Sequence, residues 1–244
     1  MNAAIFTLWG IAIAAQAALA ALLFRRRLAL LYWGVSAWAL VGVASGLHLA
    51  YSYVAHNRYP WARWQPFCLA AMILLTADVA HKLARHWPTQ AFGWVVNGIF
   101  GLLSLAAMAW VSRVLPDAAW GADLFLMRLS EQFTLACAIT IGLNWLIYSI
   151  PLDEWRKNAR RHVRMAFLLT AASGLAYLVG SSNKAYNVIA VCNLTLTTIP
   201  ICAAIGWARL SVAGERYRMV RPQEGLLEAL EEQDRRRIGR LTDD

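Results

Sequence analysis

Charged residues are scarce in this chain. Asp, Glu, Lys and Arg together make up 15% of its 244 residues, whereas soluble domains contain about 25%. Hydrophobic residues make up 59%, and they occur as long runs separated by short basic clusters. This distribution excludes an ordinary soluble domain and is typical of a protein that crosses a membrane several times.

Motifs of the common catalytic and metal sites are also missing. The sequence contains no CxxC, HExxH, phosphate-binding loop or GxSxG motif, so we expect no cofactor or metal ion and assign no catalytic residue. The four cysteines, Cys68, Cys137, Cys192 and Cys202, all lie inside apolar runs, and we interpret them as buried small hydrophobic residues. Haem would need two axial ligands at one depth. His48 and His81 lie at different depths, and the other histidines, including His162, fall in predicted loops.

Seven segments are long and apolar enough to cross a bilayer, which requires roughly 20 mostly apolar residues per helix. Short connections, several of them with proline, separate the segments, so successive helices are expected to be antiparallel. We therefore predict an all-α fold, an integral membrane bundle of seven transmembrane helices within residues 1–210. The spans are expected at about 3–24, 28–55, 65–84, 91–112, 124–150, 165–182 and 186–208.

Lys and Arg are distributed unequally between the two sides of this bundle. With the N-terminus outside, eighteen of the 23 basic residues, including Arg25, Arg26 and Arg27, fall on the inner side. Because cytoplasmic loops carry an excess of Lys and Arg, we predict an outer N-terminus and a cytoplasmic C-terminus. The net charge of +9 is then explained by inner loops that face anionic lipids of the bilayer, and no nucleic-acid partner is required.

Polar residues inside spans are costly and mark candidate functional positions. Arg128 and Glu131 are three residues apart and share one face of the fifth span. We predict an outward-facing pocket for a small-molecule or lipid ligand, to which aromatic residues at the outer edge contribute. The candidate ligand-binding residues are His48, Trp61, Trp64, Arg128, Glu131, Asn187 and Asn193.

Each of these assignments has a structural alternative. The tryptophans could anchor the chain at the membrane interface, and Arg128 with Glu131 could form an interfacial ion pair. The asparagines could serve packing between helices. Asp78 and Lys82, spaced i and i+4 near the inner end of the third span, are interpreted as a structural ion pair that neutralises both charges.

Residues 222–244, "PQEGLLEALEEQDRRRIGRLTDD", have the features of a charged helix. Pro suits the first turn, and acidic residues come early and Arg late, which complements the helix dipole. An interrupted apolar stripe has no partner within this helix, so we predict weak pairing with a second copy as a homodimer. The stripe includes Leu227, Leu230, Ile238 and Leu241. Residues 211–221 form the expected linker to this cytoplasmic signalling helix.

This architecture resembles the membrane sensor regions of bacterial signalling enzymes. The closing "RLTDD" is similar to the start of a GGDEF-type diguanylate cyclase domain, which typically runs TD-x-LTG, with Thr242 and Asp243 as its first two residues. The resemblance implies a bacterial inner membrane location and a chain that continues into a domain that synthesises a cyclic dinucleotide. The nucleotide, metal and catalytic residues of that family would lie beyond Asp244, so none is assigned.

Other functions remain open at the level of the sequence. The stretch "RRRIGR" is similar to the "RRRIAR" that precedes the phosphoacceptor histidine of sensor histidine kinases, but no histidine follows it. A small multi-span transporter, a membrane enzyme complete in itself and a non-catalytic assembly subunit are further alternatives. The tail favours a sensor and transducer module, because a transporter has no need of a paired helix.

Overall fold

All regular structure in the described part of the chain is helical, which confirms the predicted all-α class. The structure is a computed structural model, and it describes residues 3–54, 60–84, 90–114, 121–148, 157–182 and 186–211. Seven helices follow one another in these ranges. They are α1 (Ala3–Arg25), α2 (Trp33–Val54), α3 (Pro60–Ala84), α4 (Gln90–Val114), α5 (Gly121–Tyr148), α6 (Lys157–Ser182) and α7 (Tyr186–Ala208).

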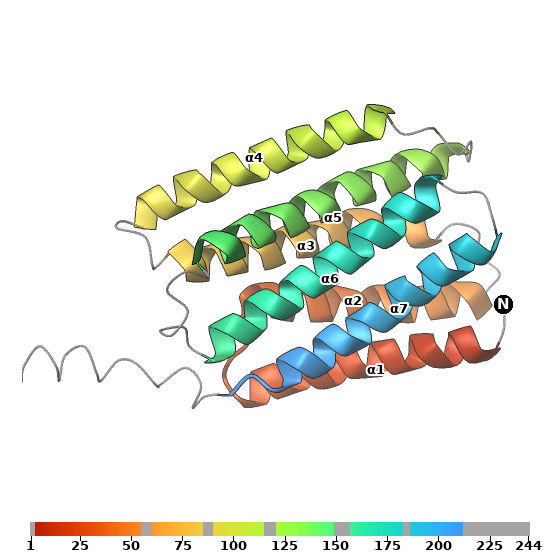
Figure 1. Ribbon diagram of the computed structural model, residues 1–244. Coiled ribbons are helices and arrows are strands. Elements are labelled where there is room, and N and C mark those ends of the chain that lie inside the picture. The colour runs from red at the N-terminus through yellow and green to blue at the C-terminus, as the bar shows by residue number, and fades with distance from the viewer. Residues whose placement is uncertain are drawn as a thin grey trace, which may run out of the picture.

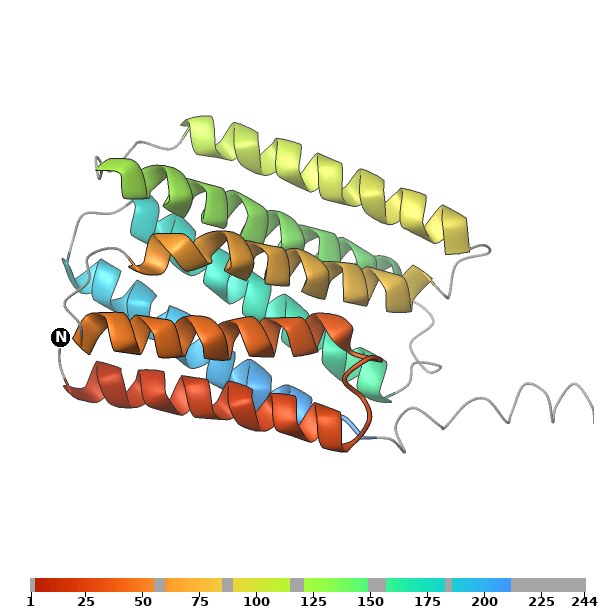
Figure 2. The same cartoon turned by 180° about the vertical axis from the view of Figure 1, so that it is seen from behind.

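The helices lie side by side along one long axis and alternate in direction (Figures 1 and 2). α1 packs against α2 and α7, and α6 packs against α5 and α7, so the first and last helices are neighbours. α4 lies at one edge of the bundle and contacts α5 and α3. α1, α3, α5 and α7 all finish at the same end of the bundle, which we call the exit end.

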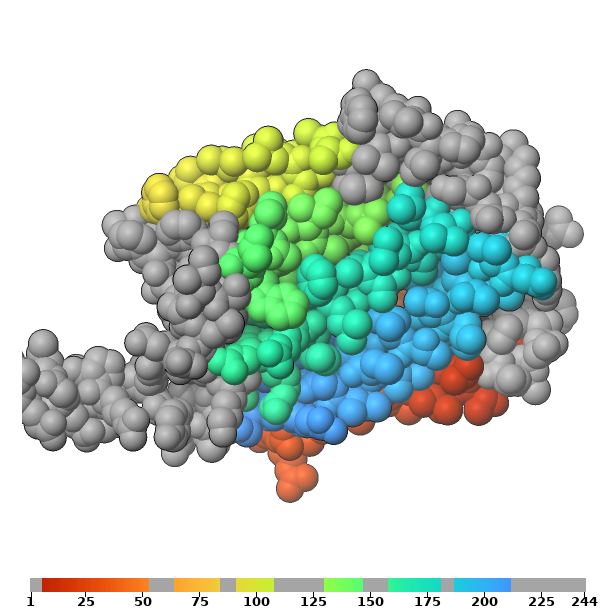
Figure 3. Space-filling model, viewed as in Figure 1, coloured from red at the N-terminus to blue at the C-terminus, as the bar shows by residue number. Residues whose placement is uncertain are grey.

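Within the described residues, five helices contain stretches long and apolar enough to cross a membrane. These stretches are Phe6–Arg25, Trp33–Ser52, Trp64–Leu83, Asn158–Gly180 and Asn187–Ala208. α4 contains a shorter apolar stretch, Ala91–Ala107. α4, α5, α6 and α7 form most of the face shown in Figure 3, and exposed apolar side chains such as Leu102, Leu175 and Val191 belong to these helices. This outward apolar surface is what a lipid-facing bundle requires.

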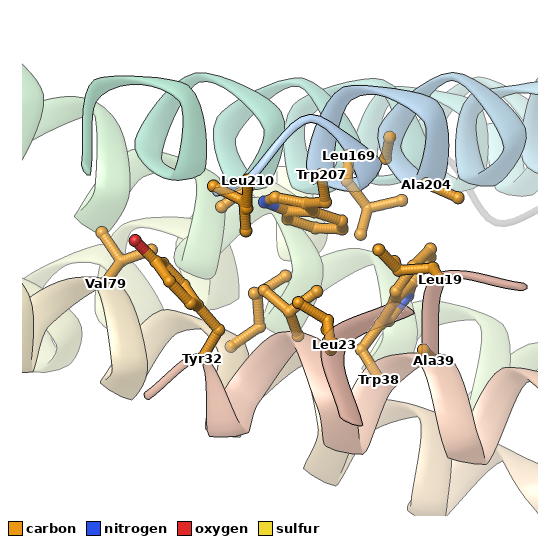
Figure 4. Packing of buried hydrophobic residues seen from close by; sticks show 14 of the residues in the cluster. Leu19, Leu23, Tyr32, Trp38, Ala39, Val79, Leu169, Ala204, Trp207 and Leu210 are labelled. Atoms are coloured by element: carbon orange, nitrogen blue, oxygen red, sulfur yellow. The ribbon is translucent and has the colours of Figure 1, made fainter. Parts of the chain in front are cut away.

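The main core joins α1, α2, α3, α6 and α7, together with Ile141 of α5, and Figure 4 shows part of it. Two tryptophans occupy its centre: Trp38 and Trp207 meet edge to face, with ring centroids 5.2 Å apart. This geometry is favourable because the positive edge of one ring meets the negative face of the other. A smaller cluster around Leu135 and Ala136 joins α5 to its neighbours.

Three sequence predictions need correction or remain outside the structure. α6 begins at Lys157 and not at 165, so His162 lies in a helix and not in a loop. Cys137 and Cys192 are buried as expected, but Cys68 is half-buried and Cys202 is exposed. The predicted signalling helix 222–244, with Leu227, Leu230, Ile238 and Leu241, and nearly all of the linker lie outside the described residues.

A Schellman motif ends α1. The Leu28 N–H donates to the Leu23 carbonyl and the Arg27 N–H donates to the Phe24 carbonyl, which are the two hydrogen bonds that define the motif. Arg27 accordingly adopts a left-handed conformation with φ of 57°. Leu28 and Leu23 are both buried in the main core, so the motif also supplies the hydrophobic contact that usually accompanies it.

Replacement of Arg27 by glycine should stabilise the fold. An L-residue in the left-handed region costs about 1–2 kcal/mol, part of which is offset because glycine loses more entropy on folding. We expect Arg27→Gly to raise the free energy of unfolding by about 1 kcal/mol, measured by denaturant titration in detergent micelles. Arg27→Ala is the matched control, because it removes the same charge but keeps the Cβ; equal stability of the two variants would contradict this account.

Candidate functional site

A carboxylate from α3 caps the beginning of α2. Asp78 is fully buried. Its Oδ2 accepts a hydrogen bond of 3.2 Å from the Gly34 N–H, and the carboxylate also accepts one from the Val35 N–H. The first N–H groups of a helix have no acceptor within the helix, and the positive end of the helix dipole favours a negative charge there. Asp78 of α3 therefore caps the N-terminus of α2, a role that no side chain directly before α2 fills.

Lys82 holds the α1–α2 connection against the same helix. Its Nζ lies 3.3 Å from Asp78 Oδ1, which confirms the ion pair predicted from the sequence. The ammonium also donates to the Leu31 carbonyl and lies 4.1 Å from the centre of the Tyr32 ring, a distance typical of a cation–π interaction. Lys82 thus fixes the segment that joins α1 to α2.

His162 brings α6 to this charge pair. Its side chain is fully buried, and its Nε2 lies 3.5 Å from Asp78 Oδ2. The imidazole ring also contacts Tyr32 and Trp207, with centroid distances of 5.2 Å and 6.1 Å. We call the five residues Tyr32, Asp78, Lys82, His162 and Trp207 the exit cluster.

The basic residues around His162 explain why sequence analysis placed it in a loop. "RKNARRHVR" has too many charges to be recognised as part of an apolar span. In α6 the charges occupy one side, where Arg164 is exposed, while Asn158, His162 and Ala166 are buried. These three buried positions are spaced i, i+4 and i+8, which places them on one face of a helix. This spacing could have identified the buried face of α6 from the sequence.

Side chains from α1 and α6 hold the end of α7. Arg26 donates to the carbonyls of Ala208 and Leu210, and Arg161 donates to that of Arg209 at 2.6 Å. Asn158 makes a paired contact with Ser211, because its amide donates to the Ser211 carbonyl and its Oδ1 accepts from the Ser211 N–H. Arginines near a helix C-terminus satisfy the last carbonyls and complement the dipole.

Two residues of the predicted ligand pocket, His48 and Trp64, meet at the opposite end of the bundle. The rings of His48 and Trp64 lie 6.0 Å apart. Glu131 is fully buried, and its neighbour Ser130 accepts a hydrogen bond from Gln65, which adjoins Trp64. α2, α3 and α5 therefore meet at this depth. We call His48, Trp64, Gln65, Ser130 and Glu131 the far cluster.

The other predicted ligand-binding residues are not part of the far cluster as described. The side chains of Trp61 and Arg128 lie outside the described portion of the structure, although both positions are helical. Asn187 and Asn193 are on α7, and both are exposed. Sequence reasoning missed Gln65 and Ser130, which join α3 to α5, because an isolated amide or hydroxyl gives no spacing signal.

The chemistry of the exit cluster is that of a buried charged contact between helices. Ionisable residues inside candidate membrane spans are expensive, and those present commonly serve function. Among the residues that the structure describes, no group of three or more His, Cys, Asp or Glu side chains could hold a metal ion. Comparison with models of known protein families, with curated proteins and with solved structures finds no match to this chain.

Substitution of Gly34 tests the close contact between α2 and α3. A Cβ at this position would lie 2.7 Å from Asp78 Cβ and 2.8 Å from Leu75 Cα, so α2 and α3 would have to move apart. We expect Gly34→Ala to lower the free energy of unfolding by about 1–3 kcal/mol, the usual cost of an overpacked core. The measurement is denaturant titration in micelles.

Gly98→Ala is the matched control for this substitution. Gly98 is also helical, but a Cβ there would meet nothing within 4 Å. Alanine should therefore be neutral or stabilise α4 by up to about 1 kcal/mol, because it has the higher helix propensity. If both variants lost the same stability, the close approach at Gly34 would not be the cause.

Proposed function

We propose that this chain is a membrane sensor and transducer. Its bundle detects a small or lipidic ligand or a membrane state, and the exit end passes a helix displacement to a cytoplasmic output. The observation that carries the proposal is the exit cluster. This buried contact joins α2, α3 and α6 to Trp207 in the last turn of α7, at the end of the described bundle.

α3 is the element that can connect the input to the output. Gln65 and Trp64 of the far cluster and Asp78 and Lys82 of the exit cluster belong to this one helix. Gln65 and Asp78 are separated by about 20 Å at a rise of 1.5 Å per residue. A ligand that shifts α3 at the far cluster would therefore move the carboxylate that caps α2 and contacts His162. Closely packed interiors transmit such shifts between discrete arrangements.

The output is proposed from the sequence beyond the described bundle. Residues 222–244 would form a helix that pairs with a second copy, and the resemblance of "RLTDD" to the start of a GGDEF domain favours cyclic dinucleotide synthesis as the output. A weakly paired helix suits a switch, because a ligand can choose only between arrangements that differ by a few kcal/mol.

The proposal includes seven spans with the N-terminus outside a bacterial inner membrane. The support is the alternation of the helices and the position of Arg25, Arg26, Arg161 and Arg164 at the exit end. Reporter fusions after Arg27, Lys157 and Asp244 should all give a cytoplasmic signal, since Lys and Arg favour that side. A periplasmic signal from the Asp244 fusion would contradict both the count of spans and the direction of the output.

Paired tails should crosslink at their apolar positions. Cysteine at Leu227 or Leu230 of the full chain in native membranes should form an intermolecular disulfide under mild oxidation, because these positions would face the second copy. Cysteine at Glu232 is the matched control on a predicted outward position and should crosslink much less. The measurement is the dimer band on non-reducing gels, in a background in which the four native cysteines are serine or alanine.

Coupling between the bundle and the tail is the functional part of this test. Trp207→Ala and Asp78→Asn should each change the disulfide yield at Leu227, because each alters the support for the last turn of α7. Leu168→Ala in α6, an exposed position, should leave the yield unchanged. Yields that are the same in all variants, with folding verified by size-exclusion chromatography, would remove the support for a transducer.

Transport of protons or a small solute is the second candidate function. It is favoured by the complete burial of Asp78, Glu131 and His162, since chains of such residues form proton pathways in transporters. The purified chain in liposomes with a trapped pH indicator distinguishes the two functions. Proton flux under an imposed membrane potential that disappears in Asp78→Asn would favour transport, and an absence of flux leaves the sensor as the proposal.

A further inference from the structure

Two buried polar atoms of the exit cluster have neither a hydrogen bond nor an ion pair among the residues that the structure describes. They are His162 Nδ1 and Trp207 Nε1, and both side chains have an exposed fraction of 0%. An unsatisfied buried polar group costs about 1–3 kcal/mol, and native proteins satisfy roughly 90% or more of them with protein or ordered water. Two such atoms on neighbouring rings, beside a carboxylate that can accept a further hydrogen bond, call for a common ligand.

The donors and acceptors in the exit cluster restrict the chemistry of this ligand. An ionised Asp78 carboxylate can only accept, the Trp207 indole can only donate, and a neutral His162 imidazole does one of each. A metal cation would be repelled by Lys82, which lies 3.3 Å from the carboxylate, and an anion would be repelled by Asp78. A small neutral molecule that both donates and accepts fits the set.

We propose that the exit cluster binds at least one buried water molecule, which bridges Asp78, His162 and Trp207. Buried water in proteins typically makes about three hydrogen bonds to otherwise unsatisfied polar groups, and this cluster offers partners from α3, α6 and α7. The inference concerns the occupant of the cluster alone and does not depend on the proposed function.

The spacing of the side chains is consistent with a bridge. His162 Nε2 lies 3.5 Å from Asp78 Oδ2, at the limit of a direct hydrogen bond, whereas the His162 and Trp207 rings have centroids 6.1 Å apart. Polar groups at separations beyond direct hydrogen-bond distance are commonly linked by water. In Figure 4 the indole nitrogen of Trp207 lies at the end of the ring nearest Leu210 and points away from Trp38. The water would therefore join α3 and α6 to the last turn of α7.

Hydroxyl-radical footprinting of the full chain in lipid nanodiscs tests the water site. A brief X-ray pulse produces radicals from water, including water bound inside a protein, and mass spectrometry then measures the oxidation rate of each tryptophan. Trp38 is the internal reference, because it contacts Trp207 in the same core and is slightly more exposed, at 6%. Trp207 should be oxidised several-fold faster than Trp38. A rate for Trp207 equal to or below that of Trp38 would overturn the proposal.

His162→Phe and His48→Phe form the matched pair of variants. Each replaces an imidazole with an apolar ring, but His162 belongs to the exit cluster and His48 to the far cluster. His162→Phe should lower the oxidation rate of Trp207 several-fold toward that of Trp38, whereas His48→Phe should leave it unchanged. A rate that is unchanged in a folded His162→Phe would also overturn the proposal. If His162→Phe does not fold, the ratio of the Trp207 and Trp38 oxidation rates in the wild-type chain still tests the proposal.

Discussion

The organisation of the bundle depends on one buried carboxylate. Asp78 accepts hydrogen bonds from the first turn of α2, pairs with Lys82 and contacts His162 of α6. In an apolar environment such a charge is tolerated only when it is paired and hydrogen-bonded, and removal of one partner from a buried pair typically costs about 3–5 kcal/mol. The positions of α2, α3 and α6 at the exit end are therefore mutually dependent: none can shift without leaving a charge or a helix terminus unsatisfied.

The far cluster and the exit cluster are two polar contact regions in a largely apolar interior. The far cluster and the exit cluster both involve α3, and leucine, alanine and methionine side chains fill most of the helix between them. Polar contacts specify one arrangement of helices more sharply than apolar packing does, because a rotated helix would expose its polar groups to hydrocarbon. A helix with specific contacts at both ends and a less directional middle can move as a unit, which is the property that the proposed transducer needs.

The sequence was sufficient for the features that depend on local composition. Hydropathy located each of the seven described helices, although it placed the start of α6 too late, and the i, i+4 spacing of Asp78 and Lys82 predicted their ion pair. The sequence could not identify Gly34 or His162 as partners of Asp78, because these contacts depend on how separate helices pack. His162 was assigned to a loop because the surrounding arginines raised the local charge. The sequence did not identify Trp207 as a core residue, because a tryptophan near a helix end can face either the membrane interface or the core. The ligand-binding role of the far cluster remains a prediction.

The hydrogen bonds from Arg26 to the carbonyls at the end of α7 have a consequence for biogenesis. Their partners are separated by more than 180 residues in sequence, although α1 and α7 are spatial neighbours. Synthesis delivers the N-terminal helices first, so the α1 surface that receives α7 stays uncovered until the last helix has been inserted. Contacts of such long sequence separation are slow to form because the loop entropy must be lost before they contribute. Docking of α7 against α1 is therefore a late step in the completion of the bundle.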